Sequence, residues 1–249
     1  MSLDAFIFAL EILGTIAFAM SGVMTAKARH MDIFGSLILG CTAAVGGGVI
    51  RDLILGVTPP MMFRNPVYVA AAAATSIVVF LFEYIRQRLD LKRQAAARPA
   101  GEEADAYVKD LYHGAAAGTA AADYTEVYHS ARTDLILNVA DTIGLAAFVA
   151  VGTETGFDRG YADNLFLCVF VGTVTGIGGG ILRDMMAGEI PLILRRHVYG
   201  LAAIIGSLAY CGMIVLGKTS FDAALVSMAV TCLVRYLAIH YRLNLPAFR

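Results

Sequence analysis

Residues 46–52 read Gly-Gly-Gly-Val-Ile-Arg-Asp, and residues 178–184 repeat the motif as Gly-Gly-Gly-Ile-Leu-Arg-Asp. Each copy lies inside a long apolar run, and the two copies are 132 positions apart. Because glycine in a helix interior costs about 1 kcal/mol relative to alanine, three in a row need an explanation. Two explanations fit the triplets. Small residues can let two helices pack closely, or the helix can break and expose its backbone carbonyls. The duplication and the adjacent charges favour the break.

The overall composition is that of a membrane protein with several spanning helices. Of the 249 residues, 58% are hydrophobic and only 16% are charged, whereas a soluble domain has about 25% charged residues. A spanning helix needs roughly 20 apolar residues. Seven runs meet this need, at residues 5–26, 33–57, 66–85, 134–154, 163–187, 198–217 and 221–240. The net charge of −1 does not indicate a nucleic acid partner, and none is expected.

The two halves of the chain match beyond the glycine motif. The matching pairs, in one order along the sequence, are Glu11/Asp141, Gly14/Gly144, Phe18/Phe148, Gly22/Gly152, Gly40/Gly172, Gly56/Gly188, Pro59/Pro191 and Arg64/Arg196. Each unit contains three predicted spans, an odd number, so the two copies must cross the membrane in opposite directions. Inverted repeats of this kind are typical of transport proteins, whose sites lie near the midplane where helices break.

We therefore predict an all-α polytopic membrane protein with seven transmembrane helices, arranged as two inverted three-helix repeats plus a seventh helix. The expected units are a first repeat over 1–86, a linker over 87–133, a second repeat over 134–217, and the seventh helix with its tail over 218–249. The apolar residues of the linker are mostly alanine, so it can bury little surface. We expect it to be flexible or partly helical.

Basic residues are distributed unequally between the two faces of the predicted membrane domain. Of the 19 lysines and arginines, 13 fall on the linker side, three fall on the side of the N-terminus, and three lie within spans. Because cytoplasmic loops are enriched in these residues, we expect the linker and the C-terminus in the cytoplasm and the N-terminus outside. Tyrosines near the span ends, Tyr68 and Tyr199 among them, are expected to form an interfacial aromatic belt.

Several ionisable residues fall inside the predicted spans, where charges are costly and point to function. They are Glu11, Arg51, Asp52, Asp141, Arg183, Asp184 and Arg235. At 1.5 Å per residue, Glu11 and Arg51 lie at one depth, roughly 9 Å from one face. Asp141 and Arg183 lie at similar depths from the other face. We predict two symmetry-related ion pairs, Glu11–Arg51 and Asp141–Arg183, although each arginine could instead snorkel or bind a carbonyl. Arg235, near the end of its span, is expected to snorkel to the membrane surface.

The sequence gives little support for catalysis or for a bound metal. The five histidines are scattered over loops and helix ends without metal-ligand spacing. The four cysteines lie in apolar runs without a Cys-x-x-Cys pair. A Gly-x-Ser-x-Gly nucleophile motif is absent from the sequence. We expect no enzyme activity, no cofactor and no structural metal.

Two three-helix units with Gly-Gly-Gly-x-x-Arg-Asp on each middle helix, followed by a seventh helix, resemble the trimeric intracellular cation (TRIC) channels. The prokaryotic branch is the more similar, and its repeat is also named a glycine-transporter domain. The resemblance covers about 3–86 and 134–240. It implies a homotrimer with a separate pore in each protomer, permeable to potassium and other monovalent cations, in a prokaryotic cell (inner) membrane.

The resemblance also implies roles for particular residues. The ion path would bend at Gly46, Gly47 and Gly48 and at Gly178, Gly179 and Gly180, where freed carbonyls can replace part of a cation's hydration shell. The candidate pore and gating charges are Glu11, Arg51, Asp52, Asp141, Arg183 and Asp184. Animal members bind a phosphoinositide through basic residues on the cytoplasmic side. Arg195 and Arg196 are therefore candidates for contact with anionic lipid.

A second function, from a different class, remains open. A carrier of a small zwitterion such as glycine would also suit inverted repeats and broken helices. Helix N-termini would bind its carboxylate, and Glu11 or Asp141 would bind its ammonium group. A purely structural scaffold would leave the midplane charges unexplained.

Overall fold

The computed structural model describes residues 3–96, 131–195 and 198–241, and the regular structure in these ranges is helical throughout. The long helices are α1 (Leu3–Ala28), α2 (Ile33–Ile54), α4 (Val67–Ala96), α6 (Ala131–Asp158), α7 (Leu165–Met186), α9 (Val198–Val215) and α10 (Ser220–His240). Two one-turn helices, α3 (Met61–Arg64) and α8 (Leu192–Arg195), follow α2 and α7. Seven helices in the described ranges are long and apolar enough to cross a membrane, which confirms the predicted spans.

Capping side chains fix where three of the spanning helices begin. Asp32 accepts a hydrogen bond from the Gly35 backbone N–H at 2.7 Å, before α2. Asn164 does the same for Leu167 before α7, at 3.0 Å, and Thr219 caps α10. Each cap satisfies a backbone donor that the first helical turn leaves without a partner.

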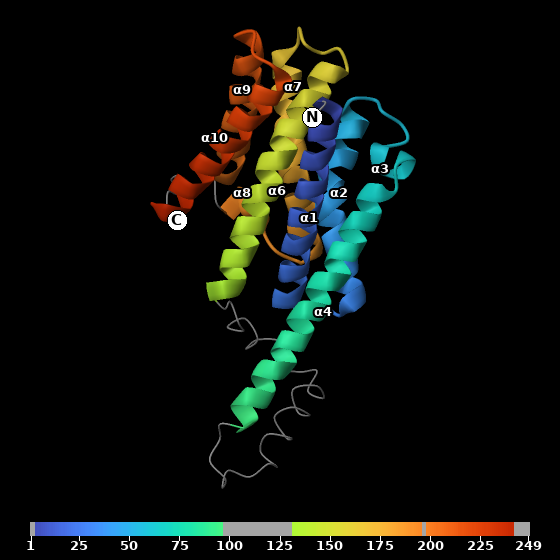
Figure 1. Cartoon of the computed structure of the whole chain (residues 1–249), viewed down its shortest axis with the longest axis vertical. Coiled ribbons are helices and arrows are strands. Elements are labelled where there is room, and N and C mark those ends of the chain that lie inside the picture. The colour runs from blue at the N-terminus through green and yellow to red at the C-terminus, as the bar shows by residue number, and fades with distance from the viewer. Residues whose placement is uncertain (1–2, 97–130, 196–197, 242–249) are drawn as a thin grey trace.

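The helix α4 is longer than its predicted span. Its spanning part ends at Asp90, but the helix continues to Ala96 and extends past the rest of the bundle, away from the N-terminus (Figure 1). The first residues of the predicted linker, 87–96, therefore belong to α4. Residues 97–130 lie outside the described ranges.

The two repeats pack against each other through their first two helices. The helix α1 lies against α6, and α2 lies against α7. The third helix of each repeat packs outside its own pair, α4 on α1 and α2, and α9 on α6 and α7. The helix α10 packs mainly on α9 and α6, at the edge of the bundle (Figure 1). It therefore adds to the second repeat and makes the two halves unequal.

Equivalent glycines hold the helices together within each repeat. A Cβ placed on Gly22 would lie 2.6 Å from the Gly40 Cα, and one placed on Gly152 would lie 3.0 Å from the Gly172 Cα. No side chain fits at these distances, so α1 approaches α2, and α6 approaches α7, backbone to backbone. The same matched pairs that indicated a duplication in the sequence thus make the same contact in both repeats.

Contacts between the repeats are reciprocal, as a two-fold relation requires. Gly14 faces the ring of Phe148, and its counterpart Gly144 faces the ring of Phe18. The two rings meet between α1 and α6 with their centroids 5.4 Å apart. The predicted inverted repeat is therefore visible in the packing of α1 on α6.

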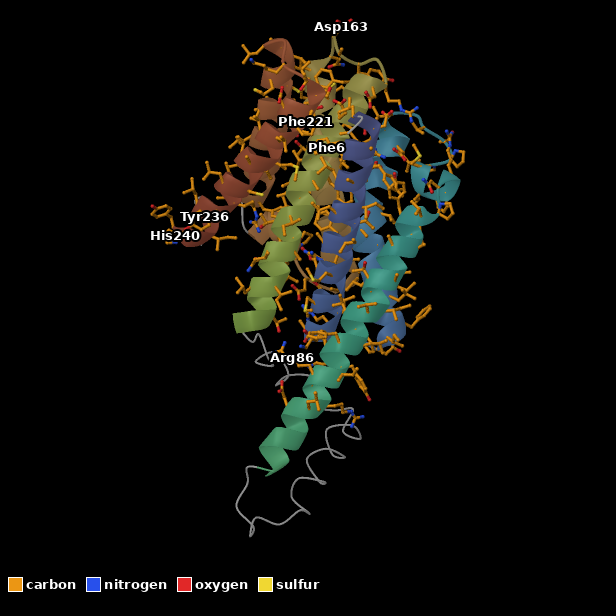
Figure 2. All side chains as sticks on the ribbon, viewed as in Figure 1. Phe6, Arg86, Asp163, Phe221, Tyr236 and His240 are labelled. Atoms are coloured by element: carbon orange, nitrogen blue, oxygen red, sulfur yellow. The ribbon has the colours of Figure 1, made fainter. Side chains whose placement is uncertain are left out.

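The outside of the bundle is apolar, as contact with lipid requires. Phe82, Phe166 and Leu233 are exposed on three different helices. Side chains project from the whole length of the bundle in Figure 2. The labelled Phe6 is buried and packs against Phe221, which is itself partly exposed, with ring centroids 4.5 Å apart. An apolar surface of this extent is typical of a protein that is embedded in a membrane.

Candidate functional site

The glycine triplets lie where α2 crosses α7. A Cβ placed on Gly47 would collide with the carbonyl oxygen of Thr175, and one placed on Gly179 would collide with that of Ala43. Ala43 and Thr175 are themselves 132 positions apart, so the crossing is reciprocal. Only glycine permits this approach of one backbone to the other.

The predicted break at the triplets is wrong. Both α2 and α7 are assigned as continuous α-helices through Gly46–Gly48 and Gly178–Gly180. The close crossing offsets the weak helix propensity of glycine without freeing the carbonyls from the helix. The alternative explanation of the triplets, close packing by small residues, accounts for their second glycines.

The third glycine of each triplet has a different neighbourhood. A Cβ on Gly48 would have one neighbour within 4 Å, the Arg51 Nη2 at 3.9 Å. A Cβ on Gly180 would lie 3.4 Å from the Tyr199 hydroxyl, 3.8 Å from the Arg183 Nη2 and 3.9 Å from the Asp141 Oδ1. Gly48 and Gly180 therefore turn towards charged groups, while Gly47 and Gly179 pack.

A first cluster of charges, Glu11, Arg51 and Asp52, lies near the end of α2. The Arg51 Nη1 is 3.9 Å from the Glu11 Oε1, and its Nε donates to the Asp52 Oδ1 at 2.9 Å. Arg51 also donates to Thr155 of α6, at 3.4 Å, and Tyr68 of α4 donates to the Glu11 carboxylate. The predicted Glu11–Arg51 pair is thus present within the first repeat, and the hydrogen bond from Arg51 to Thr155 links it to the second.

A cavity opens beside this first cluster. It has an empty volume of about 410 Å³, part of which is open solvent. Glu11, Arg51, Asp52 and Gly48 line it on the side of the first repeat, and Phe148 and Thr175 line it on the side of the second. The cavity therefore reaches from the end of α2 into the space between the repeats.

A second cluster repeats these contacts around Arg183, but it is more deeply buried. The Arg183 Nη1 is 2.8 Å from the Asp141 Oδ1, and the Nε donates to the Asp184 Oδ1 at 2.8 Å. Arg183 also donates to Ser21 of α1. Arg183 is 1% exposed and Asp141 is fully buried. The second predicted pair, Asp141–Arg183, is present, and it too reaches across to the other repeat.

The aspartates of the motif connect each arginine to the loop that follows. The Asp52 Oδ2 accepts a hydrogen bond from the Met61 backbone N–H at 2.7 Å. The Asp184 Oδ2 accepts the equivalent bond from Leu192 at 2.8 Å. Each aspartate therefore holds its arginine with one oxygen and the start of the following short helix with the other.

The prediction that Arg235 snorkels to the surface is wrong. Arg235 is only 2% exposed, and its guanidinium lies 4.7 Å from the ring centroid of Tyr199. Tyr199 itself is 2% exposed, so its predicted place in an aromatic belt is wrong as well. Thr231 and Ser227, one and two turns earlier on α10, are also buried. Polar residues at every fourth position of this span lie on one face of the helix, and this pattern in the sequence could have predicted that Arg235 points inward.

The two clusters differ in formal charge. Glu11, Arg51 and Asp52 sum to −1, with two acids and one base. Around Arg183 there are also two acids, Asp141 and Asp184, but Arg235 supplies a second base, so the sum is zero. The cavity lies on the negative cluster. The neutral cluster is the one that Arg235 and α10 cover.

Two further findings concern charges near the helix ends. Glu154, which the predicted span placed at its very end, is buried within the longer α6 and accepts a hydrogen bond from Tyr210. No matched acidic residue in the first repeat singled out Glu154 in the sequence. Of the candidate lipid contacts, Arg196 lies outside the described residues, and only the backbone of Arg195 is described, at the end of α8.

Comparison with known proteins places these features in a family. Each half of the chain matches the family described as glycine transporter, over residues 8–84 and again over 138–214. The chain belongs to this family. The two matches coincide with the two repeats. Among relatives in the family, the UPF0126 inner membrane protein YadS of Escherichia coli is 32% identical over 243 residues, which cover 97% of this chain and 96% of the relative.

Two solved structures share the fold over nearly the full length. A TRIC cation channel, solved to explain conductance, aligns with a TM-score of 0.71 at 30% identity and covers 100% of this chain and 98% of its own. The trimeric intracellular cation channel orthologue from Rhodobacter sphaeroides aligns with a TM-score of 0.72 at 28% identity, covering 96% and 99%. The predicted resemblance and the fold of two inverted repeats plus a seventh helix are confirmed.

Proposed function

We propose that this chain is a monovalent cation channel, selective for potassium, with a pore in each protomer. The observation that carries the proposal is the cavity between the repeats, which is lined by a cluster of formal charge −1. A concave site of one sign concentrates mobile ions of the opposite sign. The full-length similarity to TRIC cation channels supports the same function.

The proposed path runs from this cavity past Gly48 towards Gly180 and the second cluster. Gly47 and Gly179 hold the crossing of α2 and α7, while Gly48 and Gly180 leave room beside the charges. Arg51 alone would repel a cation, but Glu11 and Asp52 outweigh it. The glycine triplets then serve the path by keeping two unbroken helices close, rather than by breaking them.

The second cluster is the candidate gate on this path. Its charges are buried: Arg183 is paired with Asp141 and Asp184, and Arg235 brings the formal sum to zero. A neutral, closely packed region offers a cation neither attraction nor water, so it is a barrier. Rearrangement of the Asp141–Arg183 pair would open it.

We further propose the surroundings of the channel. Three protomers assemble as in the trimeric R. sphaeroides orthologue. The N-terminus lies outside, and the linker and C-terminus lie in the cytoplasm, because basic residues concentrate on that side. The chain divides at the boundaries predicted from the sequence, and Arg195 and Arg196 contact anionic lipid.

A carrier of a small zwitterion is the second candidate. One cavity contains both a base, Arg51, and an acid, Glu11, which could bind the two ends of an amino acid such as glycine. The description of the family as a glycine transporter points the same way. This arrangement would alternate its access and would not conduct continuously.

Recording from the purified protein in planar bilayers separates the two functions. A channel gives unitary currents in KCl without any substrate. A carrier gives saturable uptake of labelled glycine into liposomes and no unitary currents. Uptake without currents would overturn the channel proposal.

A further inference from the structure

The helices α1 and α6 end at opposite faces of the bundle, but their ends are built alike (Figure 1). Arg29 and Arg159 follow these helices, and each backbone N–H donates to the carbonyl of the threonine four residues earlier. The loops after α2 and α7 also match. Val57 and Glu189 each donate a backbone hydrogen bond to the carbonyl of the motif aspartate, five residues earlier. These positions are therefore equivalent in the inverted repeat, and only their side chains can make the two faces differ.

On the linker side, this shared framework carries an ion pair between the repeats. The Nε and Nη2 of Arg29 both lie 2.9 Å from the Glu189 Oε1. On the opposite side, Arg159 supplies the same cation, but the position equivalent to Glu189 is Val57. Its side chain is buried in an apolar cluster with Val171 of α7. One side therefore joins the repeats through charges, and the other joins them through apolar packing.

A second contact at the end of α1 follows the same division. The Lys27 Nζ lies 2.5 Å from the Glu83 Oε2 of α4. When α1 is aligned with α6, and α4 with α9 at their first residues, the equivalent positions are Phe157 and Ile214. These two residues belong to one apolar cluster. The end of α1 is therefore held by charges on two sides, by α4 and by the loop after α7.

The Arg29–Glu189 pair acts on the loop that the second cluster organises. The backbone carbonyl of Asp184 accepts from the Glu189 N–H at 2.9 Å, and its Oδ2 accepts from the Leu192 N–H at 2.8 Å. The other carboxylate oxygen of Asp184 holds Arg183. Residues 187–192 are thus attached to the second cluster at two points and to the first repeat through Arg29. Movement of this loop away from α1 requires the ion pair to break.

We propose that the Arg29–Glu189 pair is a clasp through which ionic strength on the linker side controls the gate, an inference that rests on the proposed channel function. The two side chains are 41% and 22% exposed, so dissolved salt can screen their attraction. Breaking the pair releases the loop, and with it Asp184, from the first repeat. Screening does not weaken the apolar contact of Val57, so the response to salt belongs to the linker side alone.

Hydrogen exchange of the loop amides tests the clasp independently of conduction. Arg29→Gln and Glu189→Gln should each speed exchange in residues 187–192 by about two- to fivefold, the effect of losing an exposed ion pair. Raising KCl from about 0.1 M to about 1 M shortens the Debye length from about 10 Å to about 3 Å. This change should speed the same amides in the wild type but not in either variant. The loop at residues 55–58 provides the internal reference.

The matched control is Arg159→Gln. This substitution removes the same cation from the equivalent position on the opposite side, where Val57 offers it no carboxylate. Exchange in residues 55–58 and in residues 187–192 should then equal that of the wild type. The double variant Arg29→Gln/Glu189→Gln should match either single variant, because two residues that act through one contact are not additive.

Single-channel recordings of the same proteins then test control of the gate. Either single variant, or salt added only on the linker side of the wild type, should raise the open-to-closed ratio by about two- to fivefold. Faster exchange with an unchanged ratio in conducting protein refutes this control.

The outcomes separate the clasp from the channel itself. Wild-type protein without unitary currents refutes the channel, while exchange still shows whether the clasp holds the loop. Unchanged exchange in both single variants refutes the clasp even if the protein conducts. An equal effect of Arg159→Gln, or effects that multiply in the double variant, refutes it as well.

Discussion

Replacing Gly179 by alanine tests the packing of α2 against α7. The added methyl would overlap the Ala43 carbonyl oxygen, a backbone atom that cannot rotate away. Overpacking costs about 1–3 kcal/mol, and this site belongs at the upper end of that range. Alanine regains about 1 kcal/mol in helix propensity. The net loss of about 2 kcal/mol should lower the Tm by about 4–8 °C for a chain of this length.

A thiol-reactive dye can follow this unfolding in detergent, because Cys168 and Cys211 are buried in the folded protein. Gly212→Ala is the matched control: it makes the same change in α9, where an added Cβ has nothing within 4 Å. Its Tm should equal or exceed that of the wild type. Gly48→Ala, which faces the cavity, should fold normally but conduct less. If Gly179→Ala is as stable as Gly212→Ala, the close crossing of α2 and α7 is refuted.

Three further predictions concern the ion pair, the assembly and the topology. Asp141→Asn and Arg183→Gln should each cost about 3–5 kcal/mol, because each leaves a buried charge uncompensated, and the double variant should cost less than their sum; additive losses of Tm would show that the two residues do not interact. Native mass spectrometry in mild detergents should show a trimer, and a monomer or dimer in all of them would count against it. A cysteine at Ala116, in the linker, should react only from the cytoplasmic side of the membrane; labelling from outside intact cells would reverse the topology.

The sequence was sufficient to predict the architecture and the ion pairs. Apolar length alone located the seven spans, and matched pairs such as Gly22/Gly152 revealed the inverted repeat. The Glu11–Arg51 and Asp141–Arg183 pairs followed from depth in the helix, because a rise of 1.5 Å per residue places residues along the membrane normal. Depth is a one-dimensional property that a sequence records well.

The sequence could not show what surrounds each residue. Three glycines suit both a break and a close crossing, and only the position of the Thr175 carbonyl against Gly47 distinguishes them. Arg235 lies close enough to the end of α10 to reach the surface, so its burial depends on which way the helix faces. That direction is set by packing on α9 and α6. The sequence likewise does not show that Tyr68 donates to Glu11 or that Tyr199 lies against Arg235.

The reversal potential across a bilayer tests the central claim most directly. With a tenfold KCl gradient, a cation-selective pore should reverse near the potassium potential, about 59 mV in magnitude for a monovalent ion. Glu11→Gln should reduce this selectivity or the unitary conductance, because it removes an acid from the cavity. The predicted result is unitary currents whose reversal potential has the sign of the potassium potential, with a lower selectivity or unitary conductance in Glu11→Gln. A reversal near zero, one of the chloride sign, or wild-type protein that conducts no unitary current would contradict the account.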